Sequence, residues 1–170
     1  FLLTQLLRDL LPSDGRVVTV ASRAHKRASL DFEDLQGERS FGGWEAYCRS
    51  KLCNVLFSAE LARRLGPQGP TSNCLHPGVV ATGFGREGNA LWRGALRLAR
   101  PFMVSAEKGA ETSIYLASSP EVQGATGRYF VRCRPVEPSR QARDPQAAAR
   151  LWELSERLVS VAANATAGQA

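Results

Sequence analysis

Apolar and polar positions alternate along the chain in a way that predicts strands separated by helices. Residues 16–21, with the sequence RVVTVA, are short, rich in β-branched side chains and bounded by turn residues, which predicts a buried strand. Residues 71–76 and 127–131 are two weaker strand candidates. Between the first two, apolar residues recur at three- and four-residue steps, which predicts a long helix over Trp44–Leu65 that ends before a Gly-Pro pair.

Three other segments carry the signals of helices. Phe1–Leu11 is an apolar stretch that is followed by the turn-forming sequence PSDG. Ser105 is expected to cap a helix that runs to about Ser118. Asp144, followed by a proline at the first helical position, is expected to open a last helix that continues through Val159.

This order of elements predicts the fold class. Strands that alternate with helices of more than about ten residues need crossover connections, and these imply a parallel sheet. The sequence therefore predicts the α/β class, with three strands and flanking helices. We expect one domain over residues 1–160, including a loop with a short amphipathic stretch in residues 83–101, and a flexible tail over residues 161–170.

Composition and charge argue against several classes of protein. The net charge of +6 could suit nucleic acid, but basic residues come in pairs at most, with acidic residues nearby, so we expect no nucleic-acid partner. Four cysteines and two histidines lack the spacing of a zinc site, so we expect no metal. No stretch approaches the roughly 18 apolar residues of a membrane span. We therefore expect no membrane anchor in these residues, and a reducing, cytoplasmic location.

The strongest chemical signal is a tyrosine and a lysine four residues apart near the start of the long helix. Tyr47 and Lys51 lie one turn apart on one helical face. A lysine ammonium close to a phenol lowers the pKa of the phenol, so the tyrosine can exchange a proton with an alcohol or carbonyl oxygen. The alternative is an ordinary helix face with an extended lysine. His25 and His76 have no acidic partner at motif spacing and are expected to be structural.

Two further groups of residues follow predicted strands, at the end where parallel α/β sheets bind ligands. Ser22 comes directly after RVVTVA, and its hydroxyl could hydrogen-bond a reacting oxygen. Pro77, Gly78, Val80 and Thr82 come after residues 71–76, where backbone amides and a threonine hydroxyl could bind an amide or a phosphate. For each group the alternative is a plain exit from a strand.

Taken in order, these groups resemble the C-terminal part of the short-chain dehydrogenase/reductase family, with its Ser, Tyr-x-x-x-Lys and Pro-Gly-x-Val-x-Thr. The resemblance is closer to the retinol-dehydrogenase-like branch, through FLLT at 1–4, AYCRSKLCNVLF at 46–57, ELARRL at 60–65, CLHPGVV at 74–80 and GRYF at 127–130. It covers about residues 1–160 and implies a Rossmann-type, doubly wound parallel sheet, in which RVVTVA would form an edge of the part present here.

The resemblance also implies a role for each motif residue. Tyr47 would be the general acid/base, and Ser22 would orient and polarise the substrate oxygen. Lys51 would lower the pKa of Tyr47 and hold the nicotinamide ribose. The cofactor would be NADP or NAD, with NADP favoured, and the contacts would come from Tyr47, Lys51, Pro77, Gly78, Val80 and Thr82. The glycine-rich loop that holds the adenine half, and the residues that select between the two cofactors, are not found in these residues.

The expected function is therefore that of an oxidoreductase that interconverts an alcohol and a carbonyl compound. The substrate would be small and apolar, and a homodimer is the assembly to consider. One alternative is a truncated, non-catalytic product that acts only by binding a partner. A basic nucleic-acid binder is the least favoured interpretation. Membrane association through a preceding segment is the alternative to a cytoplasmic location.

Overall fold

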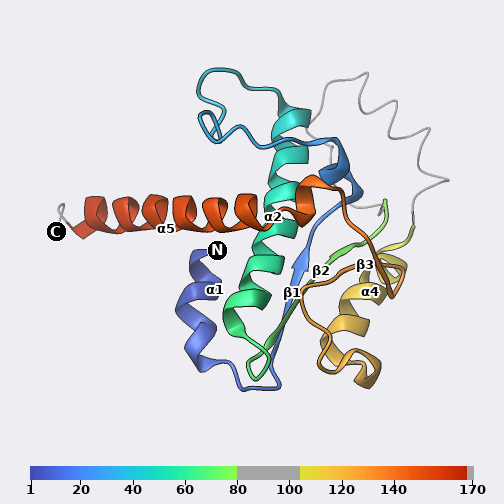
Figure 1. Ribbon diagram of the computed structural model, residues 1–170. Helices are drawn as coiled ribbons and strands as arrows, with labels where there is room; N and C mark the ends of the chain where they lie inside the picture. Colours follow the sequence, from blue (N-terminus) through green and yellow to red (C-terminus); the bar gives the residue numbers. More distant parts are fainter. Residues whose placement is uncertain (80–103, 168–170) are drawn as a thin grey trace.

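The computed structural model describes residues 1–79 and 104–167, and its strands alternate with helices as the sequence predicted (Figure 1). The helices are α1 (Leu2–Leu7), α2 (Gly43–Leu65), α4 (Ala106–Ser118) and α5 (Pro145–Ala167), and the strands are β1 (Arg16–Val20), β2 (Thr71–His76), β3 (Tyr129–Val131) and β4 (Arg134–Val136). Short 3-10 helices are η1 (Arg8–Leu10), η2 (Arg23–Arg27), η4 (Pro120–Val122) and η5 (Gln141–Arg143).

A four-stranded sheet with the order β1-β2-β3-β4 forms the centre of the structure. β1, β2 and β3 are parallel, with Val20 opposite Leu75 and His76 opposite Val131, whereas β4 is antiparallel to β3. The α/β class and the three predicted strands are confirmed. β4 is a fourth strand that the sequence analysis missed. Its three residues, RPV, are all exposed and include a proline, so neither a buried run nor an alternating pattern marks them.

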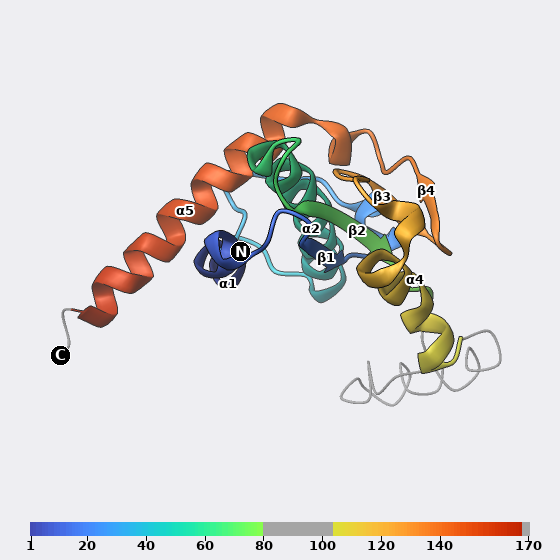
Figure 2. The ribbon, with the colours of Figure 1, turned by 90° about the horizontal axis from the view of Figure 1, so that it is seen from below.

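Helices cover both faces of the sheet (Figures 1 and 2). α2 packs against β1 and β2 on one face and α5 packs against α2, while α4 packs against the same two strands on the other face. Neighbouring residues of β3 pack on opposite faces of the sheet. Tyr129 joins the cluster that contains Leu52 of α2, and Phe130 joins the cluster that contains Leu116 of α4. The sheet therefore separates two apolar clusters, one on each face.

The burial of β1 differs from the prediction. We expected a buried strand, but residues 16–19 are half-buried and Val20 is 47% exposed. β1 lies at the end of the strand order and has a strand partner on one side only among the described residues, as the family resemblance implied. The weaker candidate, β2, is central and buried from Ser72 to His76. Burial follows the place of a strand in the sheet, which the strand's own residues do not reveal.

Helix starts agree with the capping signals. Ser105 Oγ accepts a hydrogen bond from the N–H of Lys108 at 3.3 Å, at the start of α4. At the start of α5, Asp144 Oδ1 accepts hydrogen bonds from the two N–H groups of Gln146 and Ala147. Both residues satisfy backbone donors that have no partner inside the helix, which is why they mark helix starts.

Some boundaries differ from the prediction. α1 ends at Leu7 and continues as the 3-10 helix η1 to Leu10, one residue short of the predicted end. α5 runs to Ala167, beyond the predicted end at Val159 and into the segment expected to be a flexible tail. The loop predicted over residues 83–101 lies outside the described residues. Among the helices that the structure describes, none combines the length and the apolar character needed to cross a membrane.

Candidate active site

The carboxyl ends of β1 and β2 lie side by side, and two predicted site residues directly follow them. Val20 pairs with Leu75, and this register brings Ser22 to the level of Pro77. The N–H of Arg23, just after Ser22, donates to Nδ1 of His76 at the end of β2, at 3.4 Å. This hydrogen bond keeps the two chain segments in contact. The structure thus brings Ser22 and Pro77 to one edge of the sheet, as predicted.

Gly78 follows Pro77 in a backbone conformation that favours glycine, with φ of +91°. A Cβ at this position would lie 3.2 Å from Cγ2 of Val104, which is closer than ordinary van der Waals contact. The lack of a side chain therefore allows both the turn and its close approach to the segment before α4. Val80 and Thr82, which were predicted to continue this part of the site, lie outside the described residues.

Both the side chain and the backbone carbonyl of Ser22 accept hydrogen bonds. Its Oγ accepts from the N–H of Ala24 at 3.2 Å and caps η2. Its carbonyl oxygen lies 2.6 Å from Nδ1 of His25, and Nε2 of the same ring lies 3.1 Å from the N–H of Ser139. Because Nε2 must accept from that N–H, Nδ1 carries the proton and donates to Ser22. Since Ser22 Oγ accepts from the backbone, its own proton can donate to a ligand oxygen.

Both histidines are buried and hydrogen-bonded to the backbone of this region. His25 is fully buried, and burial lowers its pKa. Burial, with a smaller contribution from Arg23, lowers the pKa of His76 to about 4. Both rings are therefore neutral near pH 7 and can accept hydrogen bonds from backbone N–H groups.

α2 places Tyr47 and Lys51 one turn apart on one face, as the spacing predicted. Lys51 Nζ lies 5.5 Å from the centroid of the Tyr47 ring. The Trp44 indole stacks on the same ring, with 5.6 Å between centroids and 26° between the planes. Sequence reasoning missed Trp44, although its position three residues before Tyr47 on a helix was a usable signal.

Asn54 fastens this face of α2 to the end of β1. It lies seven residues after Tyr47 and three after Lys51, so the three side chains share one stripe of the helix. Asn54 Nδ2 donates to the carbonyl oxygen of Val20 at 3.1 Å, two residues before Ser22. The stripe therefore runs along the carboxyl end of β1. Asn54 was missed in the sequence analysis, although a polar residue on the stripe of the Tyr-x-x-x-Lys motif was its signal.

Ser22 follows the carboxyl end of β1, and Tyr47 and Lys51 lie on the helix stripe that Asn54 links to the same end of that strand. Such a set can transfer a proton to or from a ligand oxygen and stabilise the charge that develops there. Within residues 1–79 and 104–167, no three His, Cys, Asp or Glu side chains come together as ligands for a metal ion.

Comparison with known proteins extends this assignment. No protein-family model matches the chain. The chain is 44% identical over 171 residues to mouse (Mus musculus) retinol dehydrogenase 14, covering 95% of this chain and 50% of that protein. It is 44% identical to the zebrafish (Danio rerio) WW domain-containing oxidoreductase, covering 94% of this chain and 41% of that protein. This chain belongs to the short-chain dehydrogenase/reductase family. It spans about half the length, or less, of these relatives.

Two solved structures share the fold of this chain. A protein of Mycobacterium paratuberculosis, described as uncharacterized, matches with a TM-score of 0.65 and 32% identity, over 86% of this chain and 50% of that one. A short chain dehydrogenase from Salmonella enterica matches with a TM-score of 0.56 and 20% identity, over 79% of this chain and 48% of that one. The second match shows that the fold is shared.

Proposed function

We propose that the protein containing this chain is an NAD(P)-dependent oxidoreductase that interconverts an alcohol and a carbonyl compound, with Tyr47 as general acid/base. One observation carries the proposal: Asn54, on the same helix stripe as Tyr47 and Lys51, donates a hydrogen bond to Val20 at the end of β1, two residues before Ser22. The names of the relatives, a retinol dehydrogenase and an oxidoreductase, support the same class of reaction.

Each of the three polar residues has a defined task in this proposal. Tyr47 donates a proton to the carbonyl oxygen during reduction and accepts one from the hydroxyl during oxidation. Lys51 lies beside Tyr47, with its ammonium 5.5 Å from the ring centroid, and the family resemblance implies that its charge assists the proton transfer. Ser22 donates its hydroxyl proton to the same substrate oxygen, while the hydrogen bond from His25 holds its backbone.

The residues present fit the nicotinamide half of a dinucleotide. Lys51 offers N–H donors suited to ribose hydroxyls. Pro77, Gly78, Val80 and Thr82 would contact the carboxamide and the phosphates, as the family resemblance implies. When bound, the cofactor supplies or accepts a hydride. NADP is favoured over NAD by the family resemblance, and the net charge of +6 suits its extra phosphate.

The proposed substrate is a small, apolar alcohol or carbonyl compound. Trp44, which is 49% exposed and stacked on Tyr47, supplies an apolar surface next to the reacting phenol. Retinol, which appears in the name of a relative, is the first compound to test. We also propose a homodimer, and, from the charge pattern and the cysteine usage, a cytoplasmic location without a nucleic-acid partner.

Substitution of Tyr47 tests the proposal in the complete protein that contains this chain. Tyr47→Phe should lower turnover at least about a hundredfold, because it removes the acid/base hydroxyl while the ring remains. Tyr115→Phe is the matched control, since the Tyr115 hydroxyl on α4 donates to Glu121 at 3.1 Å and belongs to the other face of the sheet. The control should keep turnover within about threefold of wild type.

Lys51→Ala separates the two roles of the lysine. If the ammonium stabilises the phenolate, its loss should move the basic limb of the pH–rate profile upward. Steady-state kinetics over a pH series measures the shift. Turnover of Tyr47→Phe close to that of Tyr115→Phe would refute Tyr47 as acid/base, and an unmoved profile in Lys51→Ala would limit Lys51 to binding.

A further inference from the structure

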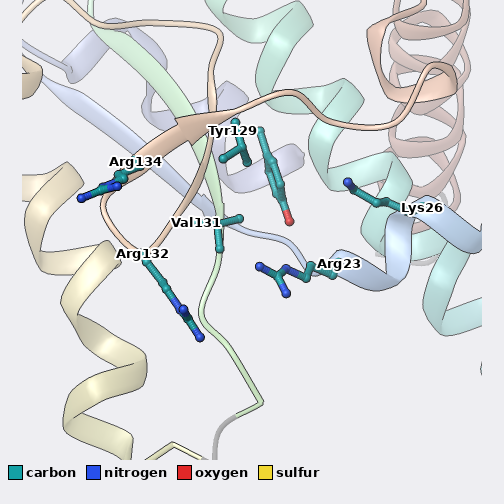
Figure 3. A pocket seen from close by; sticks show the side chains of 7 residues that line it. Arg23, Lys26, Tyr129, Val131, Arg132 and Arg134 are labelled. Atoms are coloured by element: carbon teal, nitrogen blue, oxygen red, sulfur yellow. The ribbon is translucent and has the colours of Figure 1, made fainter.

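A basic pocket lies beside the β3–β4 hairpin, next to the chain segment that follows Ser22 (Figure 3). Its volume is about 620 Å³. We call it the hairpin pocket, and its lining residues are Arg23, Lys26, Tyr129, Val131, Arg132, Arg134 and Val136. Four of the seven are cationic, and none of these four forms an ion pair with a carboxylate among the described residues. Figure 3 shows Arg23 and Lys26 on either side of the Tyr129 hydroxyl, while the Arg134 side chain points away from it. Like charges beside one hollow repel one another and favour a bound anion.

The hairpin that carries two of these cations has an unfavourable backbone conformation. Val131 pairs with Arg134 across a connection of two residues, Arg132 and Cys133, whose φ angles are +52° and +59°. Hairpin loops of this shape normally contain Asn and Gly, because other side chains cost energy at positive φ. The N–H of Cys133 donates to Thr112 Oγ1 of α4 at 3.2 Å and holds the loop. The loop therefore keeps an arginine at the pocket where a turn-forming residue would be more stable.

Tyr129 contributes an unsatisfied hydrogen-bond donor to the same pocket. Its side chain is buried, with 3% exposure, and its hydroxyl has no hydrogen-bond partner among the described residues. Figure 3 shows this hydroxyl pointing toward the space between Arg23 and Lys26. Burial raises the pKa of Tyr129, so the hydroxyl stays protonated. A buried hydroxyl without a partner destabilises the fold, and a ligand oxygen at this place would remove that cost.

We propose that the hairpin pocket binds a phosphate dianion, either as inorganic phosphate or as the phosphate of a small organic ester. A phosphate monoester carries about −1.5 to −2 charges at pH 7 and three strong acceptor oxygens, which suit several cations and a phenol donor better than a carboxylate does. The pocket is larger than a phosphate ion needs, which leaves room for an organic group. This inference goes beyond the proposed oxidoreductase function and does not depend on it.

Calorimetric titration of the complete protein with inorganic phosphate, in chloride buffer at constant ionic strength, tests the proposal. We expect saturable binding with Kd of about 1 mM or tighter. Lys26→Gln should weaken binding roughly three- to tenfold, because it removes a charge-assisted hydrogen bond at a partly exposed site. Arg27→Gln is the matched control, because Arg27 belongs to the same 3-10 helix and carries the same charge but does not line the pocket. It should leave Kd within about twofold of wild type.

Tyr129→Phe provides a readout that a purely structural role would not produce. Removing an unsatisfied hydroxyl should leave the free protein as stable as wild type or more stable, while phosphate binding weakens roughly three- to tenfold. Thermal unfolding with and without phosphate measures both effects in one experiment. A Tyr129→Phe variant that binds phosphate as wild type does would contradict the assignment of the hydroxyl to the ligand.

Titration with methyl phosphate identifies the source of the phosphate, and acetate and an RNA oligonucleotide test whether another class of anion binds instead. Methyl phosphate that binds more tightly than inorganic phosphate identifies an ester, and the reverse order identifies free phosphate; either result supports the proposal. The proposal is overturned if neither compound binds saturably, if Arg27→Gln weakens binding as much as Lys26→Gln, or if only acetate or an RNA oligonucleotide binds. Because the titration needs no turnover, its outcome is independent of the test of Tyr47.

Discussion

The two edges of the sheet differ in length, charge and proline content. β1 has five residues and presents Val17 to Val20 without a charged side chain, whereas β4 has the three residues Arg134, Pro135 and Val136. Short strands, prolines and charges on an edge prevent further strands from adding to a sheet. The β4 edge has these protective features and the β1 edge has none beyond Arg16 at its start.

The surroundings of the two edges differ in the same sense. A pocket of about 400 Å³ lies along β1. Three aromatic side chains line it: Phe1 at the start of α1, Phe57 of α2 and Trp152 of α5. The hairpin pocket, beside β4, is lined by four cationic side chains. An uncharged edge beside an apolar hollow suits contact with further apolar protein surface, and a charged edge beside a basic hollow suits a small anion. One sheet therefore offers two chemically distinct sides.

Two histidines connect these sides across the carboxyl end of the sheet. His25, in the segment after β1, accepts a hydrogen bond from the N–H of Ser139, in the segment after β4. His76, at the end of the central strand β2, accepts one from the N–H of Arg23. These two buried histidines therefore link the chain segment that follows β1 to the end of β2 and to the segment that follows β4.

The largest expected effect distinguishes the edge strand β1 from β3, the interior strand that pairs with β4, by how firmly each is packed. Phe130→Ala in β3 should lower the free energy of unfolding by about 3–5 kcal/mol, because this ring is 2% exposed. Val18→Ala in β1 should cost only about 1 kcal/mol, since Val18 is half-buried against the same cluster. Denaturant unfolding of the complete protein measures both. Equal losses would show that β1 is packed as firmly as β3.

Acid should weaken the link that His76 makes between β2 and the segment after β1. The pKa of His76 falls from 6.5 in the unfolded chain to about 4 in the fold. Between these two values the unfolded state binds a proton that the folded state does not, so stability should rise with pH across this window, by about 3 kcal/mol at most for this one group. His76→Gln should flatten the dependence in unfolding measurements at pH values of about 7 and 4.5. An unchanged slope would assign the pH dependence to other groups.

The smallest expected effect on the free energy of unfolding is that of a substitution on the exposed β1 edge, which should instead change how copies of the chain associate. Residues 1–170 expressed alone are expected to form oligomers through the β1 edge, without binding NADP. Val20→Lys should shift size-exclusion profiles toward monomer and change the free energy of unfolding by less than about 0.5 kcal/mol, because Val20 is 47% exposed. Val136→Lys on β4, where the side chain is 41% exposed, is the control and should change neither. A similar shift in both variants would contradict the difference between the edges.

Local patterns in the sequence were sufficient for the positions of most elements and for the core of the candidate site. Capping by Ser105 and Asp144 depends on residues two or three positions away, so the sequence contains the whole signal. The pairing of Tyr47 with Lys51 depends only on helical periodicity. The order of strands and motifs also sufficed to indicate the family and the α/β class.

Contacts between distant segments were decided by the tertiary structure alone. β4 exists because β3 supplies a strand partner, and the half-burial of β1 follows from its place at the end of the sheet. His25 meets Ser139 across 114 residues, and the hairpin pocket joins Arg23 to Arg132. No periodicity links residues so far apart, because strand order and loop paths determine which side chains meet. The sequence by itself therefore indicated which residues could carry chemistry, and only the fold determined which of them share a site.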